Sequence, residues 1–241
     1  MANRPVFIPK KSGPTLVEIM NVDFDWSPGL SISQKQKSIA SLHASLIKLS
    51  PEAKILEVSS KSEEILGRQL SAFNMCVKSR NGRLLSVESL FQSSKVFTSE
   101  TGVKGPFREL MLMPPNEAKQ SEKLKKSGAL KHFSFRPNES RDEEIWALEP
   151  KTAFYDWLYL NALNQSPLKE TVRGYSAFTD IEFNPNKSIN CQAYSVALWC
   201  ALKGRNLLDR KIPPREDFLK LVKQFTIHNT SDSDQLNMSL F

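Results

Sequence analysis

The chain contains little histidine, cysteine or glycine for its length. Its 241 residues include three histidines, three cysteines and nine glycines. Because no CxxC pair is present and one cysteine stays unpaired under any pairing, the cysteines indicate reduced thiols, as in a cytoplasm. With only His43, His132 and His228 available, no metal site of His and Cys ligands is expected. The rest of the composition, 40% apolar and 24% charged, is typical of a globular protein.

Long hydrophobic runs and the common enzyme motifs are also missing. The longest nearly uninterrupted apolar stretch, residues 193–202, has about half of the roughly 20 residues that a membrane-spanning helix needs. The N-terminus has no charged start followed by an apolar segment, so no secretory signal is expected. No GxSxG elbow, Walker loop, dinucleotide-binding glycine pattern or HExxH pair occurs. We therefore expect a soluble, cytoplasmic protein without a membrane partner.

Positive charge is concentrated in one region. The formal net charge is +7, and residues 104–137 hold eight Lys or Arg residues against three glutamates. Lys119, Lys123 and Lys126 fall on one face of a helix expected between about residues 116 and 126. This region is a candidate for contact with a polyanion. The alternative is a solvated helix face that serves solubility alone.

The order of patterns predicts an α+β fold that is mostly helical, with a few short strands. Residues 1–30 are rich in proline and glycine around two short apolar runs, which favours extended strands or arms. An amphipathic helix should begin with Ser33 as its N-cap and end before Pro51. We expect an N-terminal arm and helix (1–54) packed on a single main domain (55–228), followed by a frayed tail (229–241).

Within the main domain the pattern alternates between helices and turns. Asn81-Gly82 is a hairpin signal, and residues 101–106, with two glycines and a proline, predict a loop. The expected helices span residues 87–97, 107–113, 116–126, 151–164, 188–203 and 214–225.

Glu88 and Lys95 are the first candidate site residues. They lie seven residues apart in the helix expected at 87–97, so two turns place them on one face with Phe91 and close to Gln92. A carboxylate, an amine, an amide and a ring thus line one stripe. The alternative is that Phe91 belongs to the core and the charged pair flanks it on the surface.

Two lysines at a helix start form a second candidate. Lys35 and Lys37 lie in the first turn of the helix expected from Ser33, where the helix dipole disfavours cations. An anion such as a pyrophosphate bound at this helix start would offset that cost, because free N–H groups and two ammonium groups would converge on it. The alternative is a pair of solvated lysines.

Aromatic residues in polar surroundings form a third candidate. Trp157 and Trp199 lie in apolar helices and are expected in the core, whereas Trp146 follows a charged stretch and is a candidate stacking platform. Asp180 and Phe183 form a polar and aromatic pair outside any expected helix. A strand end with one buried ring is the alternative for that pair.

The motifs of this chain, taken in their order along the sequence, resemble those of the NADAR family (NAD- and ADP-ribose-associated proteins). The resemblance covers about residues 55–203, and the Glu88-to-Lys95 spacing is its most specific element. The matching motifs are Ser59-Ser60-Lys61-Ser62, Leu70-Ser71-Ala72-Phe73-Asn74, Asn81-Gly82, Val87-Glu88, Phe91-Gln92, Lys95-Val96-Phe97, Pro115-Asn116-Glu117-Ala118-Lys119, Trp146, Asp180 with Phe183, and Asn190. The chain departs from the family pattern at Ala72, at Phe183 in place of tryptophan, and after Asn190, where a glycine is usual.

The N-terminal arm and residues 28–39 and 178–185 resemble the subgroup encoded beside DarT-type toxins. The resemblance implies an antitoxin in which residues 55–228 form a NADAR-like catalytic domain. The toxins of this subgroup attach ADP-ribose to guanine in DNA, and the NADAR protein removes it by hydrolysis with no metal or cofactor. The implied partners are ADP-ribosylated DNA, ADP-ribose and a DarT-type toxin.

The resemblance also implies roles for individual residues. Glu88 would be the acid and base, and Lys95 is the first candidate for a Schiff-base nucleophile, with Lys35 and Lys61 behind it. Trp146 and Phe183 would enclose adenine or sugar, Asp180 and Gln92 would hold ribose hydroxyls, and Lys35 or Lys37 would meet the pyrophosphate. Phe73, Asn74, Phe91 and Lys61 complete the expected ligand-binding set. Lys119, Lys123 and Lys126 would grip the DNA backbone.

Three rival hypotheses remain. Some NADAR proteins resemble N-glycosidases that act on phosphorylated intermediates of riboflavin synthesis, although such a small substrate would leave the basic region without a role. A second rival is a non-catalytic protein that binds ADP-ribose or covers the toxin. In the third, the resemblance extends to the fold alone.

Overall fold

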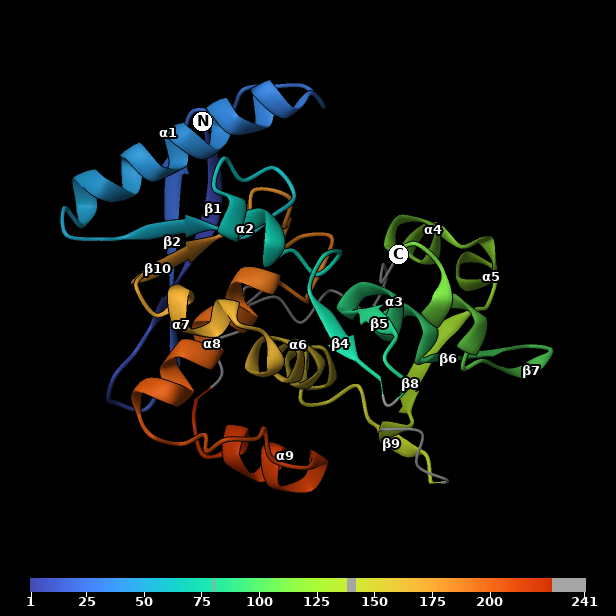
Figure 1. The fold of residues 1–241 in the computed structure, drawn as a ribbon. Helices are drawn as coiled ribbons and strands as arrows, with labels where there is room; N and C mark the ends of the chain where they lie inside the picture. The colour runs from blue at the N-terminus through green and yellow to red at the C-terminus, as the bar shows by residue number, and fades with distance from the viewer. Residues whose placement is uncertain (80, 138–141, 227–241) are drawn as a thin grey trace.

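The computed structural model describes residues 1–79, 81–137 and 142–226, drawn in colour in Figure 1. The frayed tail expected at residues 229–241 lies outside these residues. Helices and strands alternate along the described chain, and most strands belong to two four-stranded sheets. The α+β prediction is therefore confirmed.

The first sheet combines strands from distant parts of the chain. Its strands are β1 (Ala2–Pro9), β2 (Val17–Phe24), β3 (Ile55–Glu57) and β10 (Ala177–Thr179), in the order β2-β1-β10-β3. β1 pairs antiparallel with β2 and with β10, while β10 and β3 run parallel. The strands expected within residues 1–30 thus form, and they supply half of this sheet.

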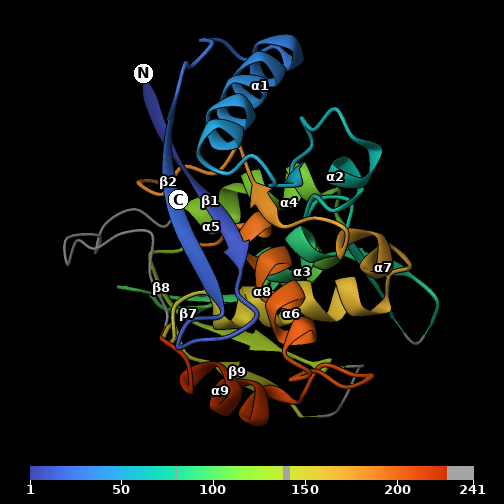
Figure 2. The same ribbon diagram turned by 90° about the vertical axis from the view of Figure 1, so that its left-hand side faces the viewer.

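Helices cover both faces of the first sheet. α1 (Ile32–Leu49) packs on one face through a core cluster that includes Leu42 and Leu46, and α8 (Gln192–Gly204) contacts β1 and β10 on the other. Figure 2 shows β1 and β2 along one side of the molecule, with α8 and then α6 inward of them. The prediction of Ser33 as the N-cap of α1 is wrong, because Ser31 forms a capping box with Gln34.

Nearly apolar helices fill the centre. α6 (Ala153–Gln165) is buried around most of its circumference, as expected of a helix that is hydrophobic on all sides. It packs against α8, with α7 (Leu168–Val172) and α9 (Arg215–Lys223) beside it (Figure 1). Trp157 and Trp199 lie in this core, as predicted.

The second sheet was not predicted. Its strands are β6 (Lys95–Ser99), β7 (Gly102–Lys104), β8 (Ala129–Phe135) and β9 (Glu144–Trp146), in the order β7-β6-β8-β9. β7 occupies half of the stretch that was expected to be a loop at 101–106. The hairpin predicted at Asn81-Gly82 is confirmed and joins β4 (Cys76–Lys78) to β5 (Leu84–Ser86).

The single helix predicted at residues 87–97 is wrong beyond Ser93. α3 spans Val87–Ser93, and Lys95 already begins β6. Both the Ser93 and the Ser94 hydroxyls donate to the Leu90 carbonyl, which competes with the next helical hydrogen bond. The chain then pairs with β8 and is no longer helical.

The helix predicted at residues 116–126 is also wrong, since two short helices replace it. α4 (Pro115–Gln120) and α5 (Glu122–Lys125) are separated by Ser121, whose backbone is not helical. Together with the short 3₁₀ helix η1 (Arg108–Leu112) they cover a small core of Phe97, Leu110 and Leu124. Lys119, Lys123 and Lys126 therefore share no single helix. The remaining short helix, α2, spans Ile65–Gln69.

Candidate active site

A cleft of about 410 Å³ lies between the segment that follows β10 and the α4–α5 region. This volume lies in the range of small-molecule binding sites. Its walls come from α3, the start of β6, α4 and α5, β8, α6 and the segment that follows β10. The charged residues on these walls are Glu88, Lys95, Lys119, Lys125, Asp180, Glu182 and Lys187.

Glu88 lies in the first turn of α3, on the wall of this cleft. Ser86 caps the helix by accepting a hydrogen bond from the Ser89 amide at 3.1 Å. A carboxylate in a first turn is favoured by the positive end of the helix dipole. One turn further along, the Gln92 side chain donates to Glu88 Oε1 at 2.9 Å. The carboxylate is thus buried and fixed in orientation.

Lys95 reaches the same cleft from β6. Its Nζ lies 5.1 Å from the centre of the Phe91 ring, within the range of a cation–π contact. Burial lowers the pKa of Lys95 to about 8, the charge of Glu88 opposes this, and the charge of Lys119 adds to it. The structure therefore brings Glu88, Phe91, Gln92 and Lys95 together, although they do not share one helix.

Lys119 also points into the cleft. Its Nζ lies 3.9 Å from Glu88 Oε1 and 5.3 Å from the centre of the Phe73 ring. Its side chain is 57% exposed, so it lies at the mouth of the cleft. Lys119, which sequence reasoning assigned to the DNA backbone, instead contacts the candidate acid and base.

The turn after β10 carries Asp180 and Phe183 to the opposite wall. The Glu182 amide donates to Asp180 Oδ1 at 3.0 Å. Burial, and then the charge of Glu57, raise the pKa of Asp180 well above its usual range. Phe183 is buried, and its ring packs edge-on against Phe7 with centroids 6.3 Å apart. The predicted pair therefore lies in the cleft.

Gln192 and Tyr155 are among the cleft residues that sequence reasoning missed. Gln192, at the start of α8, accepts from the Ala72 amide and donates to the Val58 carbonyl, both at 2.7 Å. Tyr155 of α6 packs edge-on against Phe91, with ring centroids 5.2 Å apart. Both residues reach the cleft through tertiary packing, so no local spacing identifies them.

Several expected ligand-binding residues lie elsewhere. Lys37 is exposed on α1, and Lys61 lies outside the cleft wall. The Asn74 side chain donates to the Arg68 carbonyl at 2.8 Å, also outside the wall. Trp146 is 2% exposed and packs against Phe154 and Trp157, so the prediction of a stacking platform is wrong. Its position in β9 of the unpredicted sheet explains the error.

Lys35 is engaged by protein groups. Its Nζ pairs with Glu182 Oε1 at 3.0 Å and lies 4.9 Å from the centre of the Trp26 ring. The capping box of Ser31 and Gln34 occupies the helix start where a pyrophosphate was expected. Lys35 is therefore joined to the cleft rim through Glu182 and does not line the cleft itself.

The two outer lysines are paired with acidic residues. Lys123 Nζ lies 2.6 Å from Glu109 Oε1, and Lys126 Nζ lies 3.4 Å from Glu122 Oε2. All four side chains are more than half exposed. Such surface pairs contribute little stability and exchange partners readily.

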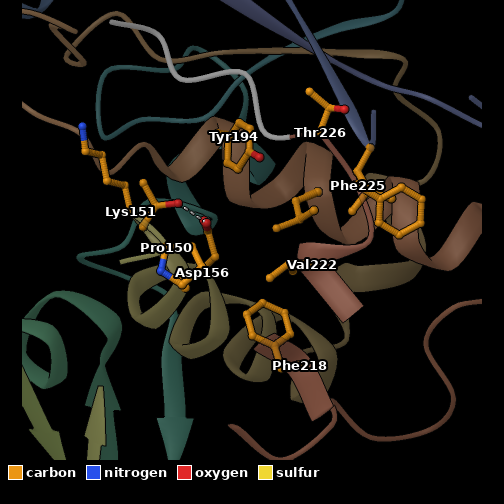
Figure 3. A pocket seen from close by; sticks show the side chains of 12 residues that line it. Pro150, Lys151, Asp156, Tyr194, Phe218, Val222, Phe225 and Thr226 are labelled. Atoms are coloured by element: carbon orange, nitrogen blue, oxygen red, sulfur yellow. Dashed lines mark hydrogen bonds between the residues drawn. The ribbon is translucent and has the colours of Figure 1, made fainter. Parts of the chain in front are cut away.

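A second, much smaller hollow of about 20 Å³, with room for about one water, lies beside the start of α6. Figure 3 shows Asp156 at its wall, with Phe218, Val222 and Phe225 closing it from the α9 side. The Thr152 and Ser195 hydroxyls each donate to the Asp156 carboxylate at 2.6 Å. Burial raises the pKa of Asp156 to about 6.

Metal ligands are not grouped within the part of the chain that the structure describes. In residues 1–79, 81–137 and 142–226, no three His, Cys, Asp or Glu side chains are placed to share an ion. Within the same residues, every helix is too short or too polar to span a bilayer. The three cysteines are free thiols.

A family model described as the DarT1-associated NADAR antitoxin matches residues 2–232. The chain belongs to this family. The resemblance inferred from the motifs is therefore confirmed, and it extends to the N-terminal strands that form half of the first sheet. No curated protein matches the sequence. Family membership supports an antitoxin role and a pairing with a DarT-type toxin, and it removes the hypothesis that the likeness is one of fold alone.

Within this NADAR domain, the motifs converge on the cleft. The motif residues Ser60, Ser71, Phe73, Glu88, Phe91, Gln92, Lys95, Lys119, Asp180, Phe183 and Asn190 all line it, although they are spread over more than a hundred positions. Because motif residues from distant parts of the sequence line this one cleft, it is the candidate active site.

Proposed function

We propose that the protein is an ADP-ribosyl-guanine glycohydrolase that removes ADP-ribose from guanine bases of DNA and thereby counteracts a DarT-type toxin. The observation that carries this proposal is the buried Glu88 carboxylate, oriented by Gln92 and facing two lysines in a cleft of nucleotide size. Family membership supports the pairing with the toxin.

The reaction adds water across an N-glycosidic bond. The bond between the anomeric carbon and the exocyclic guanine nitrogen breaks, the hydroxyl of water joins the carbon, and a proton goes to the nitrogen. Glu88 would deliver that proton or protonate the ring oxygen, and would then accept a proton from water. Because Gln92 holds one carboxylate oxygen, the other oxygen is left for the substrate.

Lys95 supports a second route within the same cleft. A lysine must be neutral to attack an opened sugar as a Schiff-base nucleophile, and the lowered pKa of about 8 leaves about one amine in ten neutral at pH 7. Lys35 is paired with Glu182 and Lys61 lies outside the cleft wall, so Lys95 is the strongest of the three candidates.

The cleft's other residues fit the remaining parts of ADP-ribose. Asp180 and Gln92 carry groups that can hold ribose hydroxyls, and Phe73 and Phe183 offer rings. Lys187 adds positive charge to the wall, and Lys125, whose Nζ lies 2.9 Å from Glu122 Oε1, can exchange that exposed pair for a pyrophosphate. We propose these two lysines in place of Lys35 and Lys37.

The experiment is release of ADP-ribose from a guanine-ADP-ribosylated DNA strand by the wild type and by Glu88→Ala, with and without a chelator. We expect release by the wild type, with and without chelation, and a loss of about 10³-fold in the variant, as positioned acid–base groups contribute 10²–10⁴-fold. A folded wild type that releases nothing would overturn the proposal.

Protection of cells separates hydrolysis from plain binding. A non-catalytic antitoxin that covers the toxin or holds ADP-ribose should still protect cells when it carries Glu88→Ala. A hydrolase should fail to protect, although the variant is folded. Turnover of a phosphorylated riboflavin intermediate in place of modified DNA would favour the other rival substrate.

A further inference from the structure

Glu57 is a buried carboxylate next to the cleft that takes no part in its wall. It ends β3, is 2% exposed and is absent from the cleft lining. Taking a carboxylate out of water is costly unless several hydrogen bonds replace the lost hydration. The partners of Glu57 therefore indicate what the residue does.

Both oxygens of Glu57 hold the chain that bears Asp180. The Ile181 amide donates to Oε1 at 2.8 Å, and the Thr179 hydroxyl donates to Oε2 at 2.6 Å. Glu57 lies opposite Thr179 in the parallel pairing of β3 with β10. The carboxylate thus binds the residue before Asp180 and the residue after it.

A third element extends this arrangement. His43 of α1 places Nε2 at 2.9 Å from Thr179 Oγ1. Burial lowers the pKa of His43 to about 4, so the ring is neutral near pH 7. Because the Thr179 hydroxyl donates to Glu57, the His43 N–H donates to Thr179, and one chain of hydrogen bonds runs from α1 through β10 to β3.

We propose that Glu57 is a positioning residue of the candidate active site, which clamps the chain on both sides of Asp180 and so places Asp180 and Phe183 on the cleft wall. The inference rests on the proposed function in one respect: it takes the ligand that binds between these residues and α3 to be ADP-ribose. Glu57 acts through the turn and touches no ligand.

The clamp also has an electrostatic consequence. Burial raises the pKa of both Glu57 and Asp180, and the hydrogen bonds that Glu57 accepts at both oxygens oppose this rise at Glu57, so the proton of the pair rests on Asp180. Asp180 is then protonated and can donate a hydrogen bond to a ribose oxygen. The other titratable groups that influence Asp180, or are influenced by it, are Arg4 from β1, Glu182 in the turn, Cys191 before α8, and Tyr155 and Tyr159 from α6.

The test compares Glu57→Ala, Glu57→Gln and Thr179→Val, with Asp156→Asn as the matched control. Asp156 is likewise a buried carboxylate with two hydrogen-bonding partners, but it faces the small hollow and not the cleft. The measurements are the Kd of free ADP-ribose by calorimetry from pH 5 to 9, and kcat and KM on ADP-ribosylated DNA. Thermal melting establishes which variants are folded.

We expect Glu57→Ala to raise Kd and KM about 10-fold or more while kcat falls less, because the turn loses both anchors. Glu57→Gln can still accept from the Ile181 amide, so it should restore Kd at pH 6 to within about threefold of the wild type. Without the neighbouring negative charge, Asp180 should ionise at lower pH, and the affinity of Glu57→Gln should fall about one pH unit earlier. Thr179→Val should give a smaller loss in the direction of Glu57→Ala.

Equal Kd and KM in folded Glu57→Ala and Asp156→Asn would overturn the inference. It would also be overturned if Glu57→Gln bound as weakly as Glu57→Ala at pH 6, or if Glu57→Ala did not fold and Thr179→Val bound like the wild type. A wild type that binds ADP-ribose but does not release it from DNA overturns the proposed hydrolysis and leaves the clamp measurable through Kd. A wild type that does not bind ADP-ribose overturns both.

Discussion

Two hollows beside α6 each hold a buried carboxylate, and they differ in what surrounds it. In the cleft of about 410 Å³, Glu88 has one amide partner and a lysine Nζ at 3.9 Å. In the hollow of about 20 Å³, two hydroxyls donate to Asp156 and apolar side chains of α9 close the space (Figure 3).

The comparison shows that an altered pKa does not by itself mark a catalytic group. The pKa of about 6 for Asp156 would suit a general acid, yet no ligand larger than water fits beside it. The proposed hydrolysis requires a carboxylate with one oxygen not taken by a protein hydrogen bond, neighbouring cations and room for a substrate. Only the cleft combines these features among the described residues of the two hollows.

The variant with the largest expected effect on the contrast between the two hollows removes the primary amine of Lys95 from the cleft. Lys95→Arg keeps the positive charge but cannot form an imine, so we expect a loss of about 10²-fold or more in kcat. Borohydride added during turnover should trap a wild-type adduct that carries the mass of the sugar ligand. The rate should rise with pH up to about 8, because the neutral amine is the reactive form.

Lys35→Arg and Lys61→Arg are the matched controls for Lys95→Arg. Both lysines were candidates on sequence grounds and neither lines the cleft, so both variants should still form the trapped adduct. An adduct that persists in Lys95→Arg would contradict the assignment of the nucleophile. Turnover by the wild type with no adduct at all would favour direct hydrolysis by Glu88.

Removal of the amide that orients Glu88 should have a smaller effect. In Gln92→Leu the carboxylate loses a hydrogen bond at 2.9 Å. A hydrogen bond to a charged group is worth roughly 1.5–3 kcal/mol, so we expect kcat to fall about 10- to 100-fold. Ser93→Ala, which removes a buried hydroxyl from the same helix, is the control and should retain activity. Equal rates in the two variants would contradict an orienting role for Gln92.

The outer lysines should have a smaller effect still. Lys123→Gln with Lys126→Gln removes two cations that are already paired with glutamates. We expect KM for modified DNA to rise a few-fold at low salt with kcat unchanged. The slope of log KM against log salt concentration should become shallower by the equivalent of up to about two phosphate contacts. Lys48→Gln, in the last turn of α1, is the control. Identical salt profiles in all three proteins would exclude these lysines from DNA contact.

Much of the candidate site could be predicted from the sequence, although the local structure behind it was partly wrong. Glu88 and Lys95 were placed together by an assumed two-turn helix, whereas the helix ends at Ser93 and a strand brings Lys95 back. The spacing gave the right neighbours for the wrong reason. Helical periodicity cannot reveal this helix end, because two serine hydroxyls take up the Leu90 carbonyl and the chain that follows pairs with the distant strand β8.

The residues missed or misplaced share one physical cause. Trp146 looked exposed in its charged stretch, but it belongs to a sheet whose other strands lie elsewhere in the sequence. Gln192 and Glu57 act through partners about 120 residues away. Such contacts depend on tertiary packing, which no local window of the sequence describes.

Asp156 should have the least effect on activity and a distinct effect on stability. Its pKa is raised from 3.8 to about 6 by burial, so between these values the folded protein binds its proton more tightly than the unfolded chain does. Its contribution to the free energy of unfolding is therefore greatest below pH 3.8 and falls as pH rises to about 6, by on the order of 3 kcal/mol. Asn at this position does not titrate, so the stability of Asp156→Asn relative to the wild type should increase from pH 4 to pH 7 in urea unfolding, while ADP-ribose release stays unchanged. A loss of release in a folded Asp156→Asn protein would mean that the small hollow and the cleft are coupled through α6, and the contrast between them would no longer hold.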